Sequence, residues 1–505
     1  MARLRAPHAQ YVVLWVLGAA ISVFTIRRGL EPFDEGLVLQ AGRRVLDGQV
    51  PYGDFRWSYG PLDPYALAAW FETFGVSVLP WRLLRVAVDA SVALTVYALI
   101  RREVPPWLAL AGWGCAACAM AQPTSANPFA PALLLCLLAV LAATSFEELP
   151  RRAALLAGLL IGVAAAWRLD FAVYGAAGAF TALALRSRSW REPAAFAGSA
   201  LVAGLVLYAP FLILAGPGTV WEELIGVSLR ERDYWTLPFP LSYDGDLRLA
   251  HLAKDGKDLL GFYVPVLLVL GVAVAGAAVV MGRLQARAAG LAVLGLGCLS
   301  YLVSRADEFH ATPLIVVLAA LLPLAIAAAG TRRALALAAA GVLALLLLHG
   351  VLNRTSALLR PEAAEAVDVD AAAGARVPPA EAMALERTVR EVRRLVPPGG
   401  AIYVLPQRSD LVRIGNPLIY VLAERENPTD RDFGLLSRRK EQREAIAALE
   451  RERPAALVRW TDPKSSRPEP NERGKPSGVV ILDDYVAANY SLVARNGYYD
   501  VLVPR

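Results

Sequence analysis

The chain has 505 residues, of which 56% are hydrophobic and 19% charged, and its formal net charge is +6. A composition this apolar excludes an ordinary soluble domain and indicates a membrane protein. The basic residues are spread over loop ends and form no aromatic-interleaved stripe, so the positive charge does not indicate nucleic-acid binding. All four cysteines lie in apolar stretches, which argues against a disulfide framework.

Apolar runs recur along the first 350 residues, each long enough to cross the roughly 30 Å hydrocarbon core as a helix. Unpaired peptide groups are costly in lipid, so a spanning segment of this kind is expected to be α-helical. The sequence therefore predicts a mainly α, polytopic membrane protein with about eleven transmembrane helices, near 11–26, 81–100, 106–121, 128–145, 152–167, 169–185, 194–215, 259–281, 286–303, 313–330 and 332–350.

Basic loops occur at every second connection between these spans. The positive-inside rule makes that side cytoplasmic, and the Ala-, Leu- and Arg-rich composition suggests a multi-pass protein of a bacterial inner membrane. The arginines that set this orientation are Arg3, Arg5, Arg101, Arg102, Arg151, Arg152, Arg186, Arg188, Arg191, Arg283, Arg287, Arg332 and Arg333.

The same rule predicts that loop 27–80, segment 216–258, the stretch 304–310 and everything after about residue 351 are extracytoplasmic. Four arginines of the first loop break the rule. They either have a function there or lie at the interface as snorkelling side chains; they are Arg27, Arg28, Arg43 and Arg44.

The periodicity of the sequence changes after residue 350 and divides the chain into a membrane body (1–350), a loose Ala-, Glu- and Asp-rich linker (351–379) and a C-terminal domain (380–505). The pattern of the last part predicts a small extracytoplasmic α/β domain that contains a mobile, Pro-rich insert. Its expected helices are 381–395, 417–424 and 438–451, its strands 401–405 and 456–460, its closing hairpin 490–495 with 498–503, and its insert 464–477.

The first extracytoplasmic loop holds the densest chemistry of the chain. Asp34 and Glu35 follow the first span directly, and Asp54, Arg56 and Tyr59 come later in the same loop as candidate substrate-binding residues. Adjacent residues on a helix point about 100° apart, so one acid can act on a substrate while the other supports it. That support would come from a metal, a backbone amide or an arginine.

Two further polar groups lie at extracytoplasmic turns. Arg168 and Asp170 flank a tight turn between two spans, where the arginine could hold a phosphate or the two could form a mutual ion pair. Asp307 and His310 share a helix face beside Arg305, and could bind a metal, a pyrophosphate or a sugar hydroxyl.

The order and common sidedness of these motifs resemble the GT-C superfamily of membrane glycosyltransferases, specifically the branch similar to dolichyl-phosphate-mannose protein mannosyltransferases and its bacterial relatives. The acidic pair Asp34-Glu35 after the first helix is the shared mark. The segments Pro51 to Phe55, Tyr59 to Pro61 and Asp307 to Pro313 also resemble bacterial members. The resemblance covers most of residues 10–320 in topology, but only these motifs in sequence.

The resemblance implies a polyprenyl-phosphate sugar donor and an inverting transfer, hexosyl or pentosyl, to a glycan, lipid or protein acceptor. Asp34 would act as the base, Glu35 would orient it or contact the acceptor, and arginines would neutralise the leaving phosphate. We favour direct contact between His310 and the donor phosphate. The alternative is a divalent metal (Mn, Mg or Zn) bound by Asp307 and His310. Which sugar and which acceptor are used, and what segment 216–258 does, stay open.

Two other functions remain as alternatives. A transporter or flippase for a lipid-linked saccharide would need ionisable residues at mid-membrane in several spans, whereas the charges of this chain cluster at the outer boundary. A non-catalytic envelope assembly subunit would keep the topology and lose the site. A single outward cavity holding Asp34, Asp307 and His310 would favour the enzyme.

Overall fold

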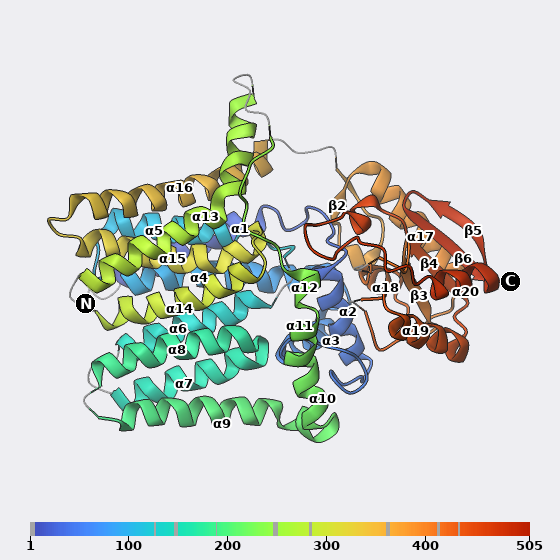
Figure 1. The fold of residues 1–505 in the computed structure, drawn as a ribbon, viewed down its shortest axis with the longest axis horizontal. Coiled ribbons are helices and arrows are strands. Elements are labelled where there is room, and N and C mark those ends of the chain that lie inside the picture. The colour runs from blue at the N-terminus through green and yellow to red at the C-terminus, as the bar shows by residue number, and fades with distance from the viewer. Residues whose placement is uncertain are drawn as a thin grey trace.

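The computed structural model describes residues 6–125, 128–145, 150–187, 189–245, 251–281, 285–359, 364–411, 415–432 and 435–505. Four of the arginines used to predict the orientation, Arg3, Arg5, Arg188 and Arg283, lie outside these ranges. The chain forms a bundle of long helices beside a C-terminal α/β domain, with a layer of short helices between them (Figure 1).

A helix is present at each of the eleven predicted apolar runs. These helices are α1 (Ala6–Val23), α4 (Val78–Ile100), α5 (Pro106–Met120), α6 (Phe129–Ser145), α7 (Pro150–Trp167), α8 (Leu169–Arg186), α9 (Arg191–Leu214), α13 (Leu252–Met281), α14 (Ala286–Ser304), α15 (Glu308–Ala328) and α16 (Arg333–Leu359). Among the described residues, seven of them (α4, α7, α9 and α13 to α16) are long and apolar enough to cross a membrane, and α1, α5 and α6 are shorter apolar helices. The polytopic α-helical class is confirmed, whereas the number of crossings stays a prediction.

Small residues let the long helices approach closely. A Cβ added at Gly158 of α7 would lie 2.2 Å from the backbone oxygen of Phe196 in α9, and one at Gly112 of α5 would lie 2.5 Å from the oxygen of Ala319 in α15. Without a hydrophobic drive between helices in lipid, such close packing is the main source of association. Helix α15 lies at the centre, buried without a break from Ala311 to Ala325.

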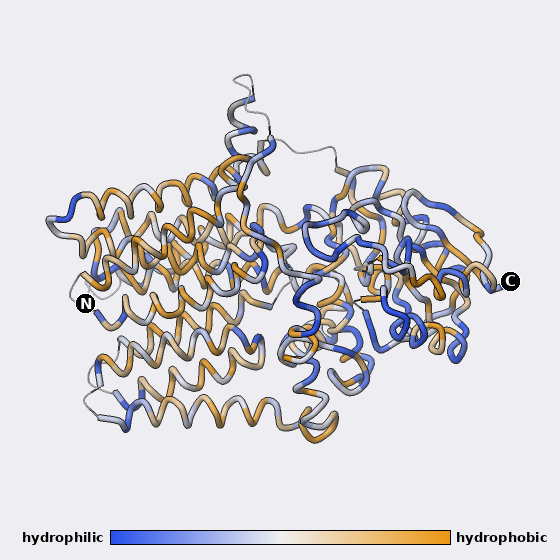
Figure 2. Tube along the Cα trace, viewed as in Figure 1, coloured by the Kyte–Doolittle hydropathy of each residue, from blue (hydrophilic) through white to orange (hydrophobic). Residues whose placement is uncertain are grey.

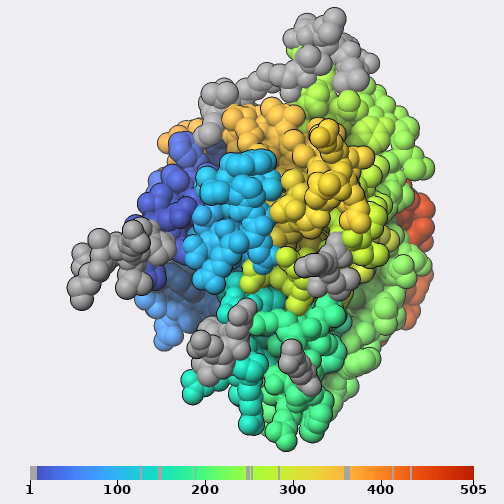
Figure 3. All heavy atoms as spheres, turned by 90° about the vertical axis from the view of Figure 1, so that its left-hand side faces the viewer, coloured from blue at the N-terminus to red at the C-terminus, as the bar shows by residue number. Residues whose placement is uncertain are grey.

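The bundle is more apolar than the rest of the molecule. Figure 2 shows the hydrophobic colour concentrated in the long helices and the hydrophilic colour in the middle layer and the C-terminal domain. The basic loops join antiparallel helices at the end remote from the C-terminal domain, the face seen in Figure 3. This segregation agrees with the charge pattern used to predict the orientation, which itself stays a prediction.

The segments predicted as extracytoplasmic loops are largely helical. The first contains α2 (Asp34–Leu46) and α3 (Leu62–Phe74), and segment 216–258 contains α10 (Pro217–Trp221), a π-helix (Glu222–Gly226), α11 (Val227–Arg230) and α12 (Arg232–Trp235). Helix α2 buries the face that carries Leu37, Val38 and Ala41. These short helices form the layer between the bundle and the C-terminal domain (Figure 1).

The C-terminal domain has the predicted α/β pattern. It contains α17 (Pro379–Leu395), β3 (Ile402–Pro406), α18 (Leu418–Ala423), α19 (Arg439–Glu452), β4 (Ala456–Trp460), α20 (Ile481–Asn489), β5 (Tyr490–Asn496) and β6 (Tyr499–Pro504). The strand order is β3-β4-β6-β5, with β3 and β4 parallel and the other pairs antiparallel. Each predicted helix and strand is present within a few residues, and α20 is the element that the sequence analysis missed.

Alternate residues of the strands face two separate cores. Ile402 and Val404 pack with α17, α18 and the apolar face of α2, whereas Tyr403 and Leu405 pack with α19 and α20. This is the period-2 alternation of a sheet covered on both faces. One core of the domain is therefore continuous with segment 27–80 of the membrane body.

The segment predicted to be a loose linker differs from that expectation. Helix α16 continues to Leu359, and β1 (Glu365–Ala366) pairs antiparallel with β2 (Arg376–Val377). The Arg376 N–H donates to the Arg27 carbonyl (2.7 Å), and the Gly29 N–H donates to the Arg376 carbonyl (2.8 Å). Backbone pairing with the start of the first loop therefore orders this segment, and composition alone could not reveal that partner.

Arginines that break the positive-inside rule hold the C-terminal domain in place. Arg43 donates to the carbonyls of Tyr420 (2.7 Å) and Arg425 (3.1 Å). Arg44 forms a two-bond ion pair with Asp432 (2.6 and 3.1 Å), and these two side chains are only 4% and 2% exposed. Arg43 and Arg44 therefore have a structural function in this loop and are not snorkelling side chains at the membrane interface.

We expect Asp432→Asn to destabilise the protein by about 3–5 kcal/mol, because it leaves the Arg44 guanidinium buried without its counter-charge. The matched control is Asp430→Asn, which removes the exposed partner of Arg56 (3.0 Å) on the same loop and should cost less than about 1 kcal/mol. Thermal unfolding of the two purified variants measures the difference. Equal losses would contradict the docking role of Arg44.

Candidate active site at one end of the bundle

A cavity of about 770 Å³ opens where the bundle, the short-helix layer and the C-terminal domain meet. Eight of the ten predicted site residues line it, namely Asp34, Arg56, Tyr59, Arg168, Asp170, Arg305, Asp307 and His310. These residues come from four separate parts of the chain. The structure thus brings together the three polar clusters that the sequence analysis identified, and leaves Glu35 and Asp54 outside the cavity lining.

Helix α2 aims Asp34 into the cavity. Its N-cap residue, Phe33, supplies no side-chain cap. Instead the Glu31 carboxylate accepts hydrogen bonds from the backbone N–H groups of Phe33 (3.0 Å) and Glu35 (2.9 Å). Because the first N–H groups of a helix lack intrahelical partners, this contact stabilises the helix start and the direction of Asp34.

Glu35 points away from the cavity and pairs with Arg82 of α4. The guanidinium donates to both carboxylate oxygens (2.7 and 2.8 Å), and the two side chains are 0% and 1% exposed. Arg82 also donates to the carbonyls of Ile26 and Gly29, each at 2.8 Å. Glu35 therefore does not lie where it could contact a substrate in the cavity. It has the other role considered for the second acid, which is support through an arginine.

Asp54 closes a turn of the same segment. Its carboxylate accepts a hydrogen bond from the backbone N–H of Val50 at 2.7 Å. This local bond uses the side chain at the surface, which explains why the residue does not reach the cavity.

Tyr59 owes its position to the glycine that follows it. A Cβ on Gly60 would lie 2.0 Å from the Ala166 carbonyl oxygen, and the Gly60 N–H donates to the Trp167 carbonyl (3.1 Å). No other residue type allows this approach to the end of α7. It places Tyr59 beside Arg168, whose guanidinium carbon lies 5.3 Å from the centre of the Tyr59 ring.

Arg168 and Asp170 form the mutual ion pair considered from sequence, with bonds of 2.9 and 3.1 Å. The guanidinium also lies over the rings of Phe171 and Tyr301 at 5.2 and 4.7 Å. Both charged residues still line the cavity. The ion pair thus orients Arg168 without removing it from the space a substrate would enter.

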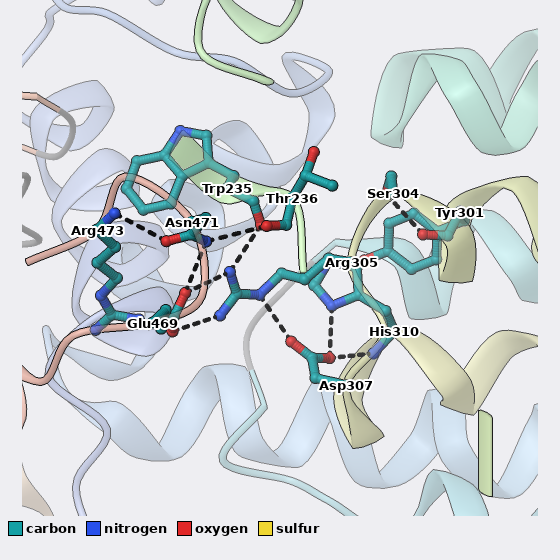
Figure 4. Close-up of polar contacts among 10 residues, drawn as sticks. All are labelled: Trp235, Thr236, Tyr301, Ser304, Arg305, Asp307, His310, Glu469, Asn471 and Arg473. Carbon is teal, nitrogen blue, oxygen red and sulfur yellow. Dashed lines mark hydrogen bonds and ion pairs between the residues drawn. The ribbon is translucent and has the colours of Figure 1, made fainter. Parts of the chain in front are cut away.

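Asp307 is the N-cap of α15 and organises the third cluster (Figure 4). One of its oxygens accepts from the His310 backbone N–H (2.9 Å) and contacts His310 Nδ1 (2.7 Å), and the other accepts from Arg305 Nε (2.7 Å). A neutral His310 therefore carries its proton on Nδ1 and its lone pair on Nε2. The ring packs on Tyr301 with centroids 4.6 Å apart.

Burial and neighbouring charges set the protonation of the acids. Burial raises the pKa of Asp34 above its ordinary value, although His310 and Arg168 oppose the rise. Burial and the nearby Asp34 charge raise the pKa of Glu31 to about 8. Burial alone would raise the pKa of Asp307, but the hydrogen bond from His310 holds it below its ordinary value. The site thus combines a carboxyl that readily accepts a proton with one that stays ionised.

A metal site is not evident. Within the described ranges, no group of three or more His, Cys, Asp or Glu side chains is arranged to hold a metal ion. Both oxygens of Asp307 already accept hydrogen bonds from Arg305 and His310. The possible divalent metal therefore stays a prediction.

Several lining residues escaped the sequence analysis. Glu31 lies three residues before the start of α2, and its capping position could have identified it. Arg431 and Arg473 of the C-terminal domain also line the cavity, but they are more than 120 residues away from the other site residues in sequence. No spacing rule could have placed them there.

We expect Glu35→Gln to destabilise the fold by about 3–5 kcal/mol, because Arg82 loses the counter-charge that offsets its burial. Asp34→Asn should leave stability unchanged or raised, because burial already disfavours the Asp34 charge. The unfolding midpoints of the two variants test this contrast between adjacent acids. A destabilised Asp34→Asn beside an intact Glu35→Gln would contradict the geometry.

Glu31 should make stability depend on pH. Its folded pKa of about 8 exceeds the ordinary 4.5, so the folded protein binds more protons between these values and its stability falls as pH rises through them. Glu31→Gln should flatten this dependence, measured as unfolding midpoints at about pH 5, 6.5 and 8. The matched control is Glu72→Gln on the exposed surface of α3. Parallel pH curves for wild type and Glu31→Gln would contradict the expectation.

Comparison with known proteins agrees with the fold. Residues 58–214 match the family described as dolichyl-phosphate-mannose-protein mannosyltransferase, and no curated protein sequence matches the chain. The crystal structure of ArnT from Cupriavidus metallidurans in the apo state aligns with a TM-score of 0.55 at 13% identity, covering 98% of this chain and 98% of that chain. The same protein bound to undecaprenyl phosphate aligns with a TM-score of 0.53 at 13% identity, covering 98% and 96%.

A third solved structure, the Archaeoglobus fulgidus oligosaccharyltransferase tethered to an acceptor peptide, aligns with a TM-score of 0.49 at 12% identity over 90% of this chain and 69% of that chain. Residues 58–214 are thus similar to a mannosyltransferase family, and the chain shares the fold of ArnT along nearly its whole length.

Proposed function

We propose that the protein transfers a sugar from a polyprenyl-phosphate donor to an acceptor on the extracytoplasmic side of a bacterial inner membrane, with Asp34 as the base. The C-terminal domain lies on that side. The observation that carries the proposal is the shared cavity at one end of the bundle, which Asp34 lines together with Arg168, Arg305 and His310. An acid and several cations at one membrane boundary suit a reaction in which a phosphate leaves.

The fold and the cavity support a polyprenyl-phosphate donor. The fold is shared with ArnT, which has been solved with undecaprenyl phosphate bound. The cavity volume of about 770 Å³ is within the usual range for small-molecule sites. The arginines at its wall suit a phosphate held at the membrane boundary, because guanidinium groups bind phosphate oxygens in pairs.

The proposed reaction is a single displacement that inverts the anomeric centre. The acceptor hydroxyl loses its proton to the Asp34 carboxylate and attacks the anomeric carbon, and the bond from that carbon to the lipid phosphate breaks. The raised pKa of Asp34 makes its carboxylate a stronger base. Arg168 and Arg305 stabilise the charge that develops on the phosphate, and His310, with a proton on Nε2 as well as on Nδ1, donates a hydrogen bond to it from Nε2.

The acceptor enters from the side formed by the short helices. Glu223, Glu231, Arg232 and Trp235 of the segment between α9 and α13 line the cavity there. This mixture of charged and aromatic side chains suits a polar glycan, lipid headgroup or protein segment, and the transferred group is a hexose or a pentose.

A transporter or flippase is the alternative, and the arrangement of charges disfavours it. The ionisable residues of the cavity gather at one end of the bundle, while the central helix α15 is apolar and buried from Ala311 to Ala325. A path across the membrane would need such residues at mid-depth.

We expect Asp34→Asn to lower the rate of sugar transfer by about 100-fold or more, because it removes a positioned general base and keeps the size of the side chain. The matched control is Asp54→Asn, which removes an acid of the same segment that does not line the cavity and should retain activity. Transfer is measured with purified protein, a polyprenyl-phosphate-linked radioactive sugar and a membrane acceptor fraction. Near-normal transfer by Asp34→Asn would reject Asp34 as the base.

A further inference from the structure

The Pro-rich insert of the C-terminal domain lies against the cavity. The sequence analysis predicted that residues 464–477 are mobile, yet the insert contacts the membrane body through Glu469 and Asn471 (Figure 4). The Asn471 amide donates to the Thr236 carbonyl at 3.1 Å. The insert is therefore held by contacts with two separate parts of the membrane body, whereas its composition predicted a mobile segment.

The Glu469 carboxylate is surrounded by donors. It accepts two hydrogen bonds from Arg305 (2.8 and 3.0 Å), one from Arg473 (2.5 Å) and one from Asn471 (3.0 Å). Burial alone would raise the pKa of Glu469, but the bond from Arg305 holds it below its ordinary value. The carboxylate is therefore an anion held between two guanidinium groups.

Both guanidinium groups belong to the wall of the cavity. Arg305 and Arg473 line it, whereas Glu469 does not belong to the lining. Within the described part of the chain, Arg473 Nε is buried and has no hydrogen-bond partner. A phosphate monoester such as undecaprenyl phosphate carries more charge than a carboxylate and has more acceptor oxygens, so it could use this donor as well as those that Glu469 occupies.

We propose that Arg305 and Arg473 form a binding site for a substrate phosphate, that Glu469 occupies this site in the present structure, and that the phosphate displaces it. The inference rests on the proposed function, because it assigns the phosphate-binding part of the same cavity. The phosphate is either that of the polyprenyl lipid or a free phosphate ion, and both share the chemistry that the two arginines recognise.

The insert can release Glu469 without leaving the domain. Residues 469–473 form a compact turn in which the Glu469 N–H donates to the Arg473 carbonyl (3.2 Å). Further along, the Ser477 N–H donates to the Asp410 carbonyl (2.8 Å) and its hydroxyl to the Ser437 carbonyl (2.5 Å). These anchors hold the end of the insert, so the turn can move while its base stays attached.

The test is equilibrium binding to the full-length protein in detergent, with undecaprenyl phosphate, inorganic phosphate and uncharged undecaprenol as three separate probes. Glu469→Gln should bind the phosphate-bearing probe about tenfold more tightly, because it removes the competing charge. Arg473→Gln should bind it about tenfold more weakly. Undecaprenol binding should not change in either variant.

The matched control is Glu472→Gln. Glu472 belongs to the same insert and pairs with Lys475 at 2.8 Å, with both side chains about half exposed. The substitution changes the net charge by the same amount away from Arg305, so phosphate binding should match wild type. An equal gain in Glu472→Gln and Glu469→Gln would show a general charge effect and overturn the inference.

Unchanged or weaker phosphate binding by a folded Glu469→Gln would overturn the inference as well. If that variant does not fold, unaltered binding by Arg473→Gln has the same consequence. A response to undecaprenyl phosphate alone assigns the site to the lipid, and an equal response to inorganic phosphate assigns it to a free ion. If the phosphate affinities shift as expected but the wild-type protein transfers no sugar, the proposed function is rejected and the inference stands. If the wild-type protein transfers sugar but the affinities of the variants do not shift, only the inference is rejected.

Discussion

The buried ion pair between Glu35 and Arg82 is the interaction on which the site depends. It joins the segment after α1, the start of α2 and the second turn of α4, because Arg82 also binds the carbonyls of Ile26 and Gly29. Burying two charges is costly, so such a pair is weak evidence for stability. Its consequence here is orientation: with Glu35 fixed on Arg82, the neighbouring Asp34 points about 100° away and lines the cavity.

The second constraint is that the cavity is complete only when the C-terminal domain is docked. Arg44 and Asp432 join this domain to α2 through a nearly fully buried pair, and Gly36 allows α2 to approach α18, since a Cβ there would lie 2.5 Å from the Leu418 nitrogen. Arg473 reaches the cavity from the same domain. The domain thus forms part of the wall of the site, and its loss would leave the cavity open on one side.

Much of the fold could be predicted from the sequence because its signals are local. The apolar runs have the length that a bilayer requires, and the hairpin around Asn496-Gly497 has characteristic turn residues. The helices α2 and α3 were missed because their charged and aromatic residues resemble a loop, and they are stabilised by packing against distant elements. The order of segment 364–379 likewise depends on backbone partners in the first loop.

The site was predicted in part for the same reason. Asp34, Arg168 and His310 stand out because each lies in a loop or turn near the end of a predicted span, and the ends of spans meet at the membrane boundary. The exclusion of Glu35 depends on Arg82, a residue that the apolar pattern of α4 concealed. The contact between Glu469 and Arg305 joins residues 164 positions apart, which no local pattern indicates.

The most direct test of the account is a structure of the protein with undecaprenyl phosphate, determined by electron cryo-microscopy in lipid nanodiscs. Density for the phosphate is expected inside the cavity, within hydrogen-bond distance of Arg305 and facing Asp34. A phosphate bound elsewhere, with the cavity empty and Asp34 far from the lipid headgroup, would contradict it.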